Sequence, residues 1–161
     1  MNRPGLNQDL LNQRLAEISR DLAELELFQK YTIEAFLEGK NFAIAEHYLR
    51  RALEAVFQIG NHIVSRLYFS LSERPTTYKE IAQSLGKSGI LPLEFAHGSL
   101  TQMAGYRHRL VHFYHEVTPE EMYEVIQNHL KDFEFFCEKI ADLIKNPSIF
   151  GINISQKDEK I

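Results

Sequence analysis

The sequence predicts an all-helical domain on three grounds. Glycine and proline are scarce, numbering 8 and 5 in 161 residues, and they fall between long uninterrupted stretches. In those stretches apolar residues recur at alternating intervals of three and four, which places them on one face of a helix. No segment alternates apolar and polar residues for long enough to form a strand. Four long helices with short connections and one additional short helix predict an up-and-down bundle.

The first two long helices are expected over residues 6–37 and 41–71, and the stretch around Gly39 separates them. Each helix has one apolar seam with a period near 3.5 residues, which favours helices that cross at shallow angles. The seams consist of Leu11, Leu15, Ile18, Leu22 and Leu25 in the first helix, and of Phe42, Ala45, Leu49, Ala52, Val56, Ile59, Ile63 and Leu67 in the second.

A short helix is expected over residues 77–85, with Thr76 or Thr77 as its N-cap and Gly86 at its end. The third long helix begins near Pro92, because proline is favoured at the first helical position. Its seam passes through Leu93, Ala96, Leu100 and Met103, then Arg107, then Leu110.

The last long helix begins at a predicted capping box, with Thr118 as N-cap and Glu121 three residues later, and ends at Asn146-Pro147. Its apolar surface is wide, because four residues add to its seam: Val125, Leu130, Phe135 and Cys137. A second buried face in a homodimer explains this width, and so does complete burial within one chain. The predicted domain spans residues 1–146, and residues 147–161 form a C-terminal tail.

Composition and charge exclude several classes of protein. With 44% hydrophobic residues and a net charge of −4, the chain is predicted to be folded. No apolar run approaches the roughly 18–20 residues of a membrane helix, and the N-terminus lacks a secretory signal. We therefore expect a cytoplasmic protein without a membrane partner, and the single Cys137 excludes an internal disulfide. The acidic balance argues against coating nucleic acid by bulk charge, so any RNA contact is local.

Arg107 is the first candidate for function, because it occupies a seam position where Leu or Met is expected. A buried guanidinium is costly unless it is paired or faces a cleft. Two structural interpretations stand beside a functional one: the side chain extends to solvent at the helix end, or it pairs with a glutamate.

Arg107 also opens the cluster RHRLVHFYH, which spans residues 107–115 of an otherwise acidic chain. Cations stabilise the C-terminal end of a helix, so a structural role suffices to explain them. The functional alternative is a small pocket for phosphate. On a continuous helix His112 points about 140° away from Arg107. A shared site therefore requires the helix to end near Leu110–His112, so that His112 and Tyr114 lie in a turn and converge on Arg107.

The pattern Arg107-x4-His112-x-Tyr114 resembles the R-x4-H-x-Y signature of the HEPN superfamily. More narrowly, the chain resembles the HepT toxin family, the nuclease half of HepT–MntA toxin–antitoxin pairs. The resemblance extends over residues 104–136, over the segment 46–66 and over the segment 75–92. One departure is His108, which stands where the family usually has Asn directly after the motif arginine.

The resemblance implies a homodimeric endoribonuclease that needs no metal and no cofactor. Its substrate is expected to be cellular RNA, for example tRNA, and the RNA 2′-hydroxyl is the nucleophile. His112 is then expected to move a proton, since a histidine of ordinary pKa titrates near neutral pH. Arg107 is expected to hold the scissile phosphate. His108 and Arg109 are expected to shape the site or contact RNA.

The resemblance assigns a regulatory role to Tyr114. In this family the motif tyrosine accepts AMP from a MntA-like nucleotidyltransferase antitoxin, and the added negative charge beside Arg107 blocks the RNA phosphate. A structural alternative is that Tyr114 packs beneath the last helix. For the chain as a whole, the alternative function is a non-catalytic HEPN-like binding subunit that accompanies a nucleotidyltransferase. Such bundles typically lack the Arg–His pair, so the presence of Arg107 and His112 favours the enzyme.

Overall fold

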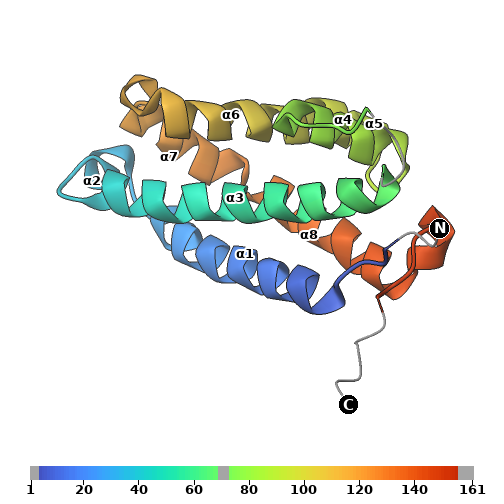
Figure 1. Cartoon of the computed structure of the whole chain (residues 1–161). Coiled ribbons are helices and arrows are strands. Elements are labelled where there is room, and N and C mark those ends of the chain that lie inside the picture. Colours follow the sequence, from blue (N-terminus) through green and yellow to red (C-terminus); the bar gives the residue numbers. More distant parts are fainter. Residues whose placement is uncertain (1–3, 69–72, 156–161) are drawn as a thin grey trace, which may run out of the picture.

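The computed structural model describes residues 4–68 and 73–155, and these ranges contain the predicted helical bundle (Figure 1). Helix α1 is followed by the short α2, and the long α3 runs back beside α1. Helices α4, α5 and α6 lie across α3 from α1, and α7 and α8 close the bundle behind them. The bounds are α1 Gln8–Phe28, α2 Ile33–Phe36, α3 Asn41–Leu67, α4 Tyr78–Lys87, α5 Leu93–Phe95, the π-helical η1 Ala96–Leu100, α6 Thr101–His112, the 3₁₀ turn η2 Tyr114–Glu116, α7 Pro119–Asn128, α8 Leu130–Lys145 and the 3₁₀ turn η3 Pro147–Phe150.

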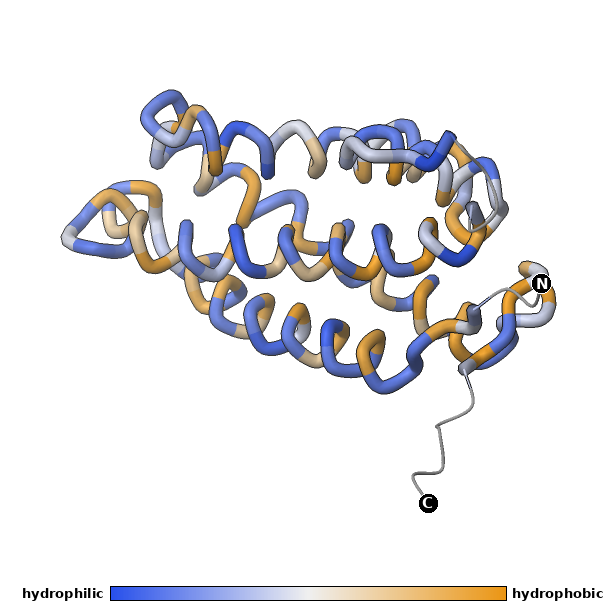
Figure 2. The backbone as a smooth tube through the Cα atoms, viewed as in Figure 1, coloured by the Kyte–Doolittle hydropathy of each residue, from blue (hydrophilic) through white to orange (hydrophobic). Residues whose placement is uncertain are grey.

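The core lies where the predicted seams meet, and Figure 2 shows the hydrophobic positions turned toward one another between the helices. Helix α3 is central, since it contacts α1, α4, α6 and α7. Its predicted seam is buried except at its ends, where Phe42 and Leu67 are partly exposed. The largest fully buried side chains include Phe36, Phe57, Phe133 and Phe136. Burial of these seams accounts for the cohesion of the bundle.

The predicted length of the first helix, residues 6–37, is wrong. Helix α1 ends at Phe28, and a short turn separates it from α2. In that turn the Thr32 side chain accepts a hydrogen bond from the Ala35 amide and begins the new helix. Helix α7 holds the turn in place: the Tyr123 hydroxyl donates to the Tyr31 carbonyl at 2.6 Å, and the Gln29 side-chain amide donates to the Ile126 carbonyl at 2.9 Å. Contacts distant in sequence therefore break the helix that the local pattern predicts.

The last predicted helix is also divided, into α7 and α8, at His129. The His129 backbone leaves helical geometry with φ −121° and ψ 1°, and its carbonyl accepts a hydrogen bond from the Asp132 amide. The bend allows both halves to follow the bundle, so Leu130 is buried while Val125 and Cys137 are partly buried against the core. Packing within one chain thus covers much of the wide apolar surface that the sequence shows.

The short helix α4 agrees closely with its prediction. It begins after Thr77, whose side chain accepts a hydrogen bond from the Glu80 amide, and the Thr77 amide in turn donates to the Glu80 carboxylate. This capping box satisfies two amides that the first turn would otherwise leave without partners.

Part of the predicted tail packs against the beginning of the chain. The Leu6 amide donates to the Asn153 carbonyl at 2.7 Å, the Ser155 amide donates to the Leu6 carbonyl at 2.9 Å, and Ile152 is buried. Gly5 is required at this crossing, since a Cβ there would lie 2.4 Å from the Ser155 nitrogen. The domain boundary at residue 146 stays a prediction, and the charged end of the tail, 156–161, lies outside the described residues. In the described ranges, no helix is both long enough and apolar enough to cross a membrane.

His62 is a buried histidine near the end of α3 that fastens the start of α1. Its Nε2 accepts a hydrogen bond from the Asn7 amide at 3.0 Å, and the Asn7 side chain in turn caps α1. Burial lowers the pKa of His62 to about 4, and the positive charge of Arg66 adds to this effect. His62 is therefore neutral in the folded protein at neutral pH.

We expect the free energy of unfolding to fall as the pH drops from 6.5 toward 4. In this interval the unfolded chain binds a proton at His62 and the folded chain does not, so acid favours unfolding by on the order of 1–3 kcal/mol. His62→Gln removes the titration and keeps an acceptor for the Asn7 amide. Urea unfolding at several pH values, with the exposed His97→Gln as control, measures the difference. Equal pH slopes in wild type and His62→Gln would contradict this role.

Candidate functional site

The candidate site lies where α6 ends, at the same end of the bundle as the start of α3 (Figure 1). Helix α6 contains Arg107, His108, Arg109 and His112, and the 3₁₀ turn η2 begins with Tyr114. The predicted end of the helix near Leu110–His112 is confirmed, since Phe113 leaves helical geometry with φ −132° and ψ 40°. His112 is nevertheless the last residue of α6, so its predicted place in the turn is wrong.

Arg107 is paired and partly buried. Its Nη2 donates to Glu54 Oε1 on α3 at 2.7 Å, and its side chain is 17% exposed. The guanidinium carbon lies 4.6 Å from the centre of the Tyr78 ring, which stacks on Phe57 at 4.7 Å. Its Nε is buried without a hydrogen-bond partner among the described residues. The arginine on the seam is thus accommodated by a glutamate and an aromatic face, and it keeps an unused donor.

His112 is exposed and turned toward His108, with the two rings 4.7 Å apart. His108 also lies 5.7 Å from the Phe113 ring. Since His112 continues the helix, the angle of about 140° between it and Arg107 remains. The predicted convergence of His112 on Arg107 is therefore not found within one copy of the chain, where Arg107 faces α3 and α4 instead.

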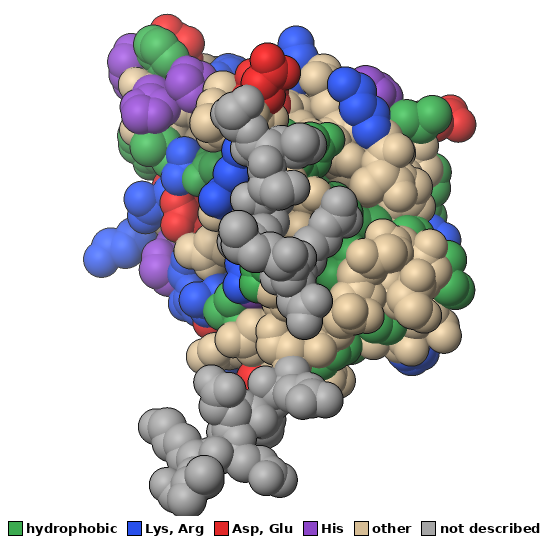
Figure 3. Space-filling model, turned by 45° about the vertical axis from the view of Figure 1, so that its right-hand side comes forward, with side chains coloured by type: hydrophobic (Ala, Val, Ile, Leu, Met, Phe, Trp, Pro, Cys, Tyr) green, Lys and Arg blue, Asp and Glu red, His purple; other side chains and the backbone are tan. Residues whose placement is uncertain are grey.

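Tyr114 stacks on Phe42 at the start of α3, with ring centroids 6.1 Å apart, and is 44% exposed. Its aromatic packing partner is therefore Phe42 of α3. Val111, Phe113 and Ile44 are exposed as well. Figure 3 shows histidine side chains gathered at the upper left of the molecule, with hydrophobic side chains beside them. An exposed apolar group of this kind is typical of a surface that contacts another protein.

Arg109 connects the end of α6 to the start of α7. Its guanidinium forms hydrogen bonds to both carboxylate oxygens of Glu121, and its Nη2 also donates to the Glu116 carbonyl at 3.4 Å. The hydrogen bonds to Glu121 raise the pKa of Arg109. One of the two hydrogen bonds of the capping box predicted at Thr118 is present: the Thr118 side chain accepts from the Glu121 amide at 3.1 Å. The Glu121 carboxylate binds Arg109 instead. A contact between Arg109 and RNA stays a prediction.

A hollow of about 550 Å³ lies beside His108, where α4 meets α6. Tyr78 lines this hollow and its ring also contacts the guanidinium of Arg107, so the hollow adjoins the surroundings of Arg107. The described residues contain no group of three or more His, Cys, Asp or Glu side chains arranged to hold a metal ion.

Sequence reasoning missed Glu54 and Tyr78, which contact Arg107 directly. Glu54 lies 53 positions from Arg107 in the chain, and no motif spacing connects them. The available signal was the need of a seam arginine for an acidic partner, which points to a glutamate but selects none.

Comparison with known proteins decides the family. A family model described as ribonuclease HepT-like matches residues 18–140. The chain belongs to the HepT-like ribonuclease family. The prediction of an endoribonuclease of this family is thereby confirmed.

Two curated relatives and one solved structure of the HepT-like type are similar to this chain. The tRNA nuclease HepT of Aphanizomenon flos-aquae is 29% identical over 132 residues, which cover 81% of this chain and 87% of that protein. The mRNA nuclease HepT of Shewanella oneidensis is 29% identical over 92 residues, or 57% of this chain and 66% of that protein. The solved structure is a tri-AMPylated Shewanella oneidensis HEPN toxin in complex with an MNT antitoxin. It has a TM-score of 0.73 at 23% identity, covering 84% of this chain and 98% of the solved one, and it confirms the predicted fold.

Proposed function

We propose that this HepT-like ribonuclease is the toxin of a toxin–antitoxin pair, that it cleaves cellular RNA as a homodimer without a metal ion, and that AMP transfer onto Tyr114 silences it. The observation that carries the proposal is the partly buried guanidinium of Arg107, held at the end of α6 that also bears His112 and Tyr114. The names of the relatives support it, since they are described as a tRNA nuclease, an mRNA nuclease and an AMPylated toxin bound to its antitoxin.

In the proposed reaction, the RNA 2′-oxygen attacks the adjacent phosphorus and the bond from phosphorus to the 5′-oxygen breaks. One His112 ring takes the proton of the 2′-hydroxyl, and a second His112 ring, from the other subunit, gives a proton to the leaving 5′-oxygen. Arg107 binds the non-bridging phosphate oxygens, on which negative charge develops. The products are a 2′,3′-cyclic phosphate and a 5′-hydroxyl.

In the proposed reaction, Arg107 donates hydrogen bonds to the phosphate. Its contacts in the structure determine which N–H groups are available. Glu54 occupies Nη2, while Nε is buried without a partner. Glu54 accepts one of the five N–H groups of the guanidinium, so N–H groups of Nη1 and Nη2 remain for two hydrogen bonds to a phosphate. Glu54 thus keeps the guanidinium in place for the substrate.

The direction of the side chains supports the proposed homodimer. One copy turns Arg107 toward α3 and α4 and leaves His112 exposed beside His108, so a second copy is needed to bring an imidazole to the bound phosphate. The exposed side chains of Val111 and Phe113 provide apolar surface for that contact. Sedimentation equilibrium is expected to give twice the chain mass, and a monomer that cleaves RNA at full rate would contradict the shared site.

The test of the function is cleavage of RNA by the purified chain in the presence of EDTA. We expect cleavage at an unchanged rate after metal removal, because the proposed chemistry uses a histidine and an arginine. Cleavage that stops in EDTA and returns with a divalent cation would contradict the metal-independent mechanism. A chain that binds RNA or an antitoxin but never cleaves would instead support the non-catalytic binding subunit.

A further inference from the structure

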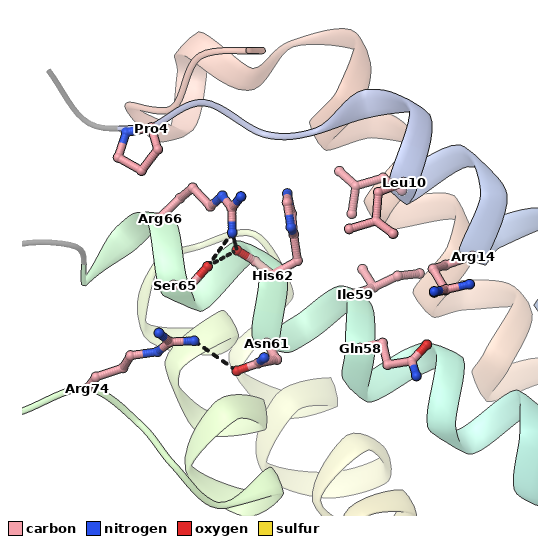
Figure 4. A pocket seen from close by; sticks show the side chains of 11 residues that line it. Pro4, Leu10, Arg14, Gln58, Ile59, Asn61, His62, Ser65, Arg66 and Arg74 are labelled. Atoms are coloured by element: carbon pink, nitrogen blue, oxygen red, sulfur yellow. Dashed lines mark hydrogen bonds between the residues drawn. The ribbon is translucent and has the colours of Figure 1, made fainter.

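A second group of arginines lines a hollow between the start of α1 and the last turns of α3, at the opposite end of α3 from the 107–114 segment (Figure 4). The hollow has a volume of about 560 Å³ and is bordered by Arg14, Arg66 and Arg74. No Asp or Glu is among the described residues that line it, and His62, which also lines it, is neutral at pH 7. The hollow is therefore positively charged in a chain whose net charge is −4.

Arg66 and Arg74 make hydrogen bonds to neutral oxygens alone in the part of the chain that the structure describes. Arg66 Nη1 donates to Ser65 Oγ at 2.6 Å and its Nε donates to the Gly5 carbonyl at 3.3 Å, while Arg74 Nη2 donates to Asn61 Oδ1 at 3.1 Å. Burial lowers the pKa of Arg66, and the charge of Arg74 lowers it further. Across the described residues, ion pairs are formed by five other arginines: Arg14, Arg50, Arg51, Arg107 and Arg109. Two guanidinium groups that repel each other thus have no carboxylate between them.

Arg14 closes the hollow from the α1 side (Figure 4). Its Nη1 pairs with Glu17 at 2.8 Å, but its Nε is buried without a partner among the described residues. A buried donor without an acceptor is unfavourable, and the charge of Arg14 adds to that of Arg66 and Arg74 at the hollow. The positive charge of the arginines that border the hollow favours an anion there over a neutral ligand.

A polar strip on α3 connects this hollow to Arg107. Glu54, Gln58, Asn61 and Ser65 are spaced four, three and four residues apart, so they share one face of the helix. Gln58 and Arg14 line both the arginine hollow and a smaller hollow of about 230 Å³, which also contains Arg51 and the carboxylates of Glu17, Asp21 and Glu54. Since Glu54 binds Arg107, the strip begins at the proposed site of cleavage. From Glu54 to Asn61 the distance along the helix is about 10 Å at 1.5 Å per residue.

On the basis of the proposed ribonuclease function, we infer that the hollow formed by Arg14, Arg66 and Arg74 binds a backbone phosphate of the same RNA strand, a short distance from the bond that is cut. A strand that places one phosphate on Arg107 and follows the polar face of α3 reaches the arginine hollow at Gln58 and Asn61. The local charge gives an acidic protein an RNA contact that its overall charge does not provide. The hollow therefore acts in substrate positioning and does not take part in the chemical step.

The test is binding of a labelled single-stranded RNA of about 12 nucleotides, measured by fluorescence anisotropy at several salt concentrations. All proteins carry His112→Ala so that the RNA stays intact. Arg74→Gln is the informative variant, because Arg74 is exposed and its removal breaks one side-chain hydrogen bond, to Asn61. Lys131→Gln, an exposed residue at the start of α8, is the control with the same change of charge.

We expect Arg74→Gln to bind this RNA roughly three- to tenfold more weakly and to lower the slope of log K against log salt by about 0.7, the loss of one phosphate contact. Lys131→Gln should leave both values unchanged. Equal affinity and slope in Arg74→Gln and Lys131→Gln would overturn the inference. Binding of free phosphate alone would also overturn the inference. In that case inorganic phosphate would raise the melting temperature of the parent and not that of Arg74→Gln, while both proteins would bind RNA with equal affinity.

The two proposals fail separately in these experiments. RNA binding that depends on Arg74 in a chain that cuts no RNA would contradict the nuclease and support the phosphate contact. Metal-independent cleavage by the wild-type chain, together with RNA binding that Arg74→Gln leaves unchanged, would remove the phosphate contact and leave the nuclease.

Discussion

Arg107→Ala and His112→Ala are each expected to reduce RNA cleavage by about 10²–10⁴-fold. The first removes the group that holds the developing negative charge, and the second removes the proton carrier. Neither variant should unfold the domain, because Glu54 is 42% exposed and becomes solvated when Arg107 is lost, while His112 is exposed at the end of α6. The cleavage rate of a labelled RNA measures the loss, and circular dichroism measures the fold.

Two matched substitutions separate a loss of chemistry from a loss of charge. Arg50→Ala removes an exposed arginine of α3, and His97→Ala removes an exposed histidine, so both should cleave RNA at nearly the wild-type rate. Arg107→Lys is expected to recover little, because an ammonium lacks the planar pair of donors that fits a phosphate. Full activity in Arg107→Ala or in His112→Ala would show that the site lies elsewhere.

Tyr114→Phe is expected to escape silencing by the nucleotidyltransferase antitoxin. Tyr114 is 44% exposed at the start of η2, which gives a partner enzyme access to this side chain. In the transfer, the tyrosine oxygen attacks the α-phosphorus of ATP, pyrophosphate leaves and the phenolic proton is lost. The attached phosphate is then expected to compete with RNA for the cationic side chains of the 107–115 segment, and its covalent attachment makes its effective concentration high.

Mass spectrometry after incubation with ATP and the antitoxin measures this modification directly. Wild type should gain one or more AMP groups on Tyr114, and Tyr114→Phe should gain none there and should remain active. Tyr31→Phe is the control, since Tyr31 is another exposed tyrosine, 39% exposed, in the turn before α2. AMP on a different residue, or silencing of Tyr114→Phe by modification, would show that the switch is another side chain.

Local signals in the sequence predicted the features that depend on neighbouring residues. The apolar seam of α3 and the capping box of Thr77 with Glu80 are examples, since each rests on positions within one or two turns. The turn before α2 and the bend at His129 were missed. The first depends on hydrogen bonds to α7, and the second depends on how α7 and α8 follow the rest of the bundle.

The motif residues of the candidate site could be predicted from the sequence, but the residues that contact them could not. The R-x4-H-x-Y spacing identified Arg107, His112 and Tyr114, and the end of α6 was found from the geometry that a shared site requires. Glu54 could not be found, because 53 residues separate it from Arg107. The direction of His112 was predicted wrongly, since α6 continues through it and the missing partner for Arg107 is proposed to come from a second chain.

The most direct measurement compares an RNA with a matched RNA that carries a single 2′-deoxy substitution at the cleaved nucleotide, both incubated with the purified chain in EDTA. If Arg107 and His112 act on the 2′-hydroxyl, the unmodified RNA yields a 2′,3′-cyclic phosphate and a 5′-hydroxyl, and the substituted RNA stays intact at that bond. Cleavage of the 2′-deoxy bond at the same rate, or products that end in a 5′-phosphate, would contradict the proposed mechanism, because water or another nucleophile would then have attacked the phosphorus.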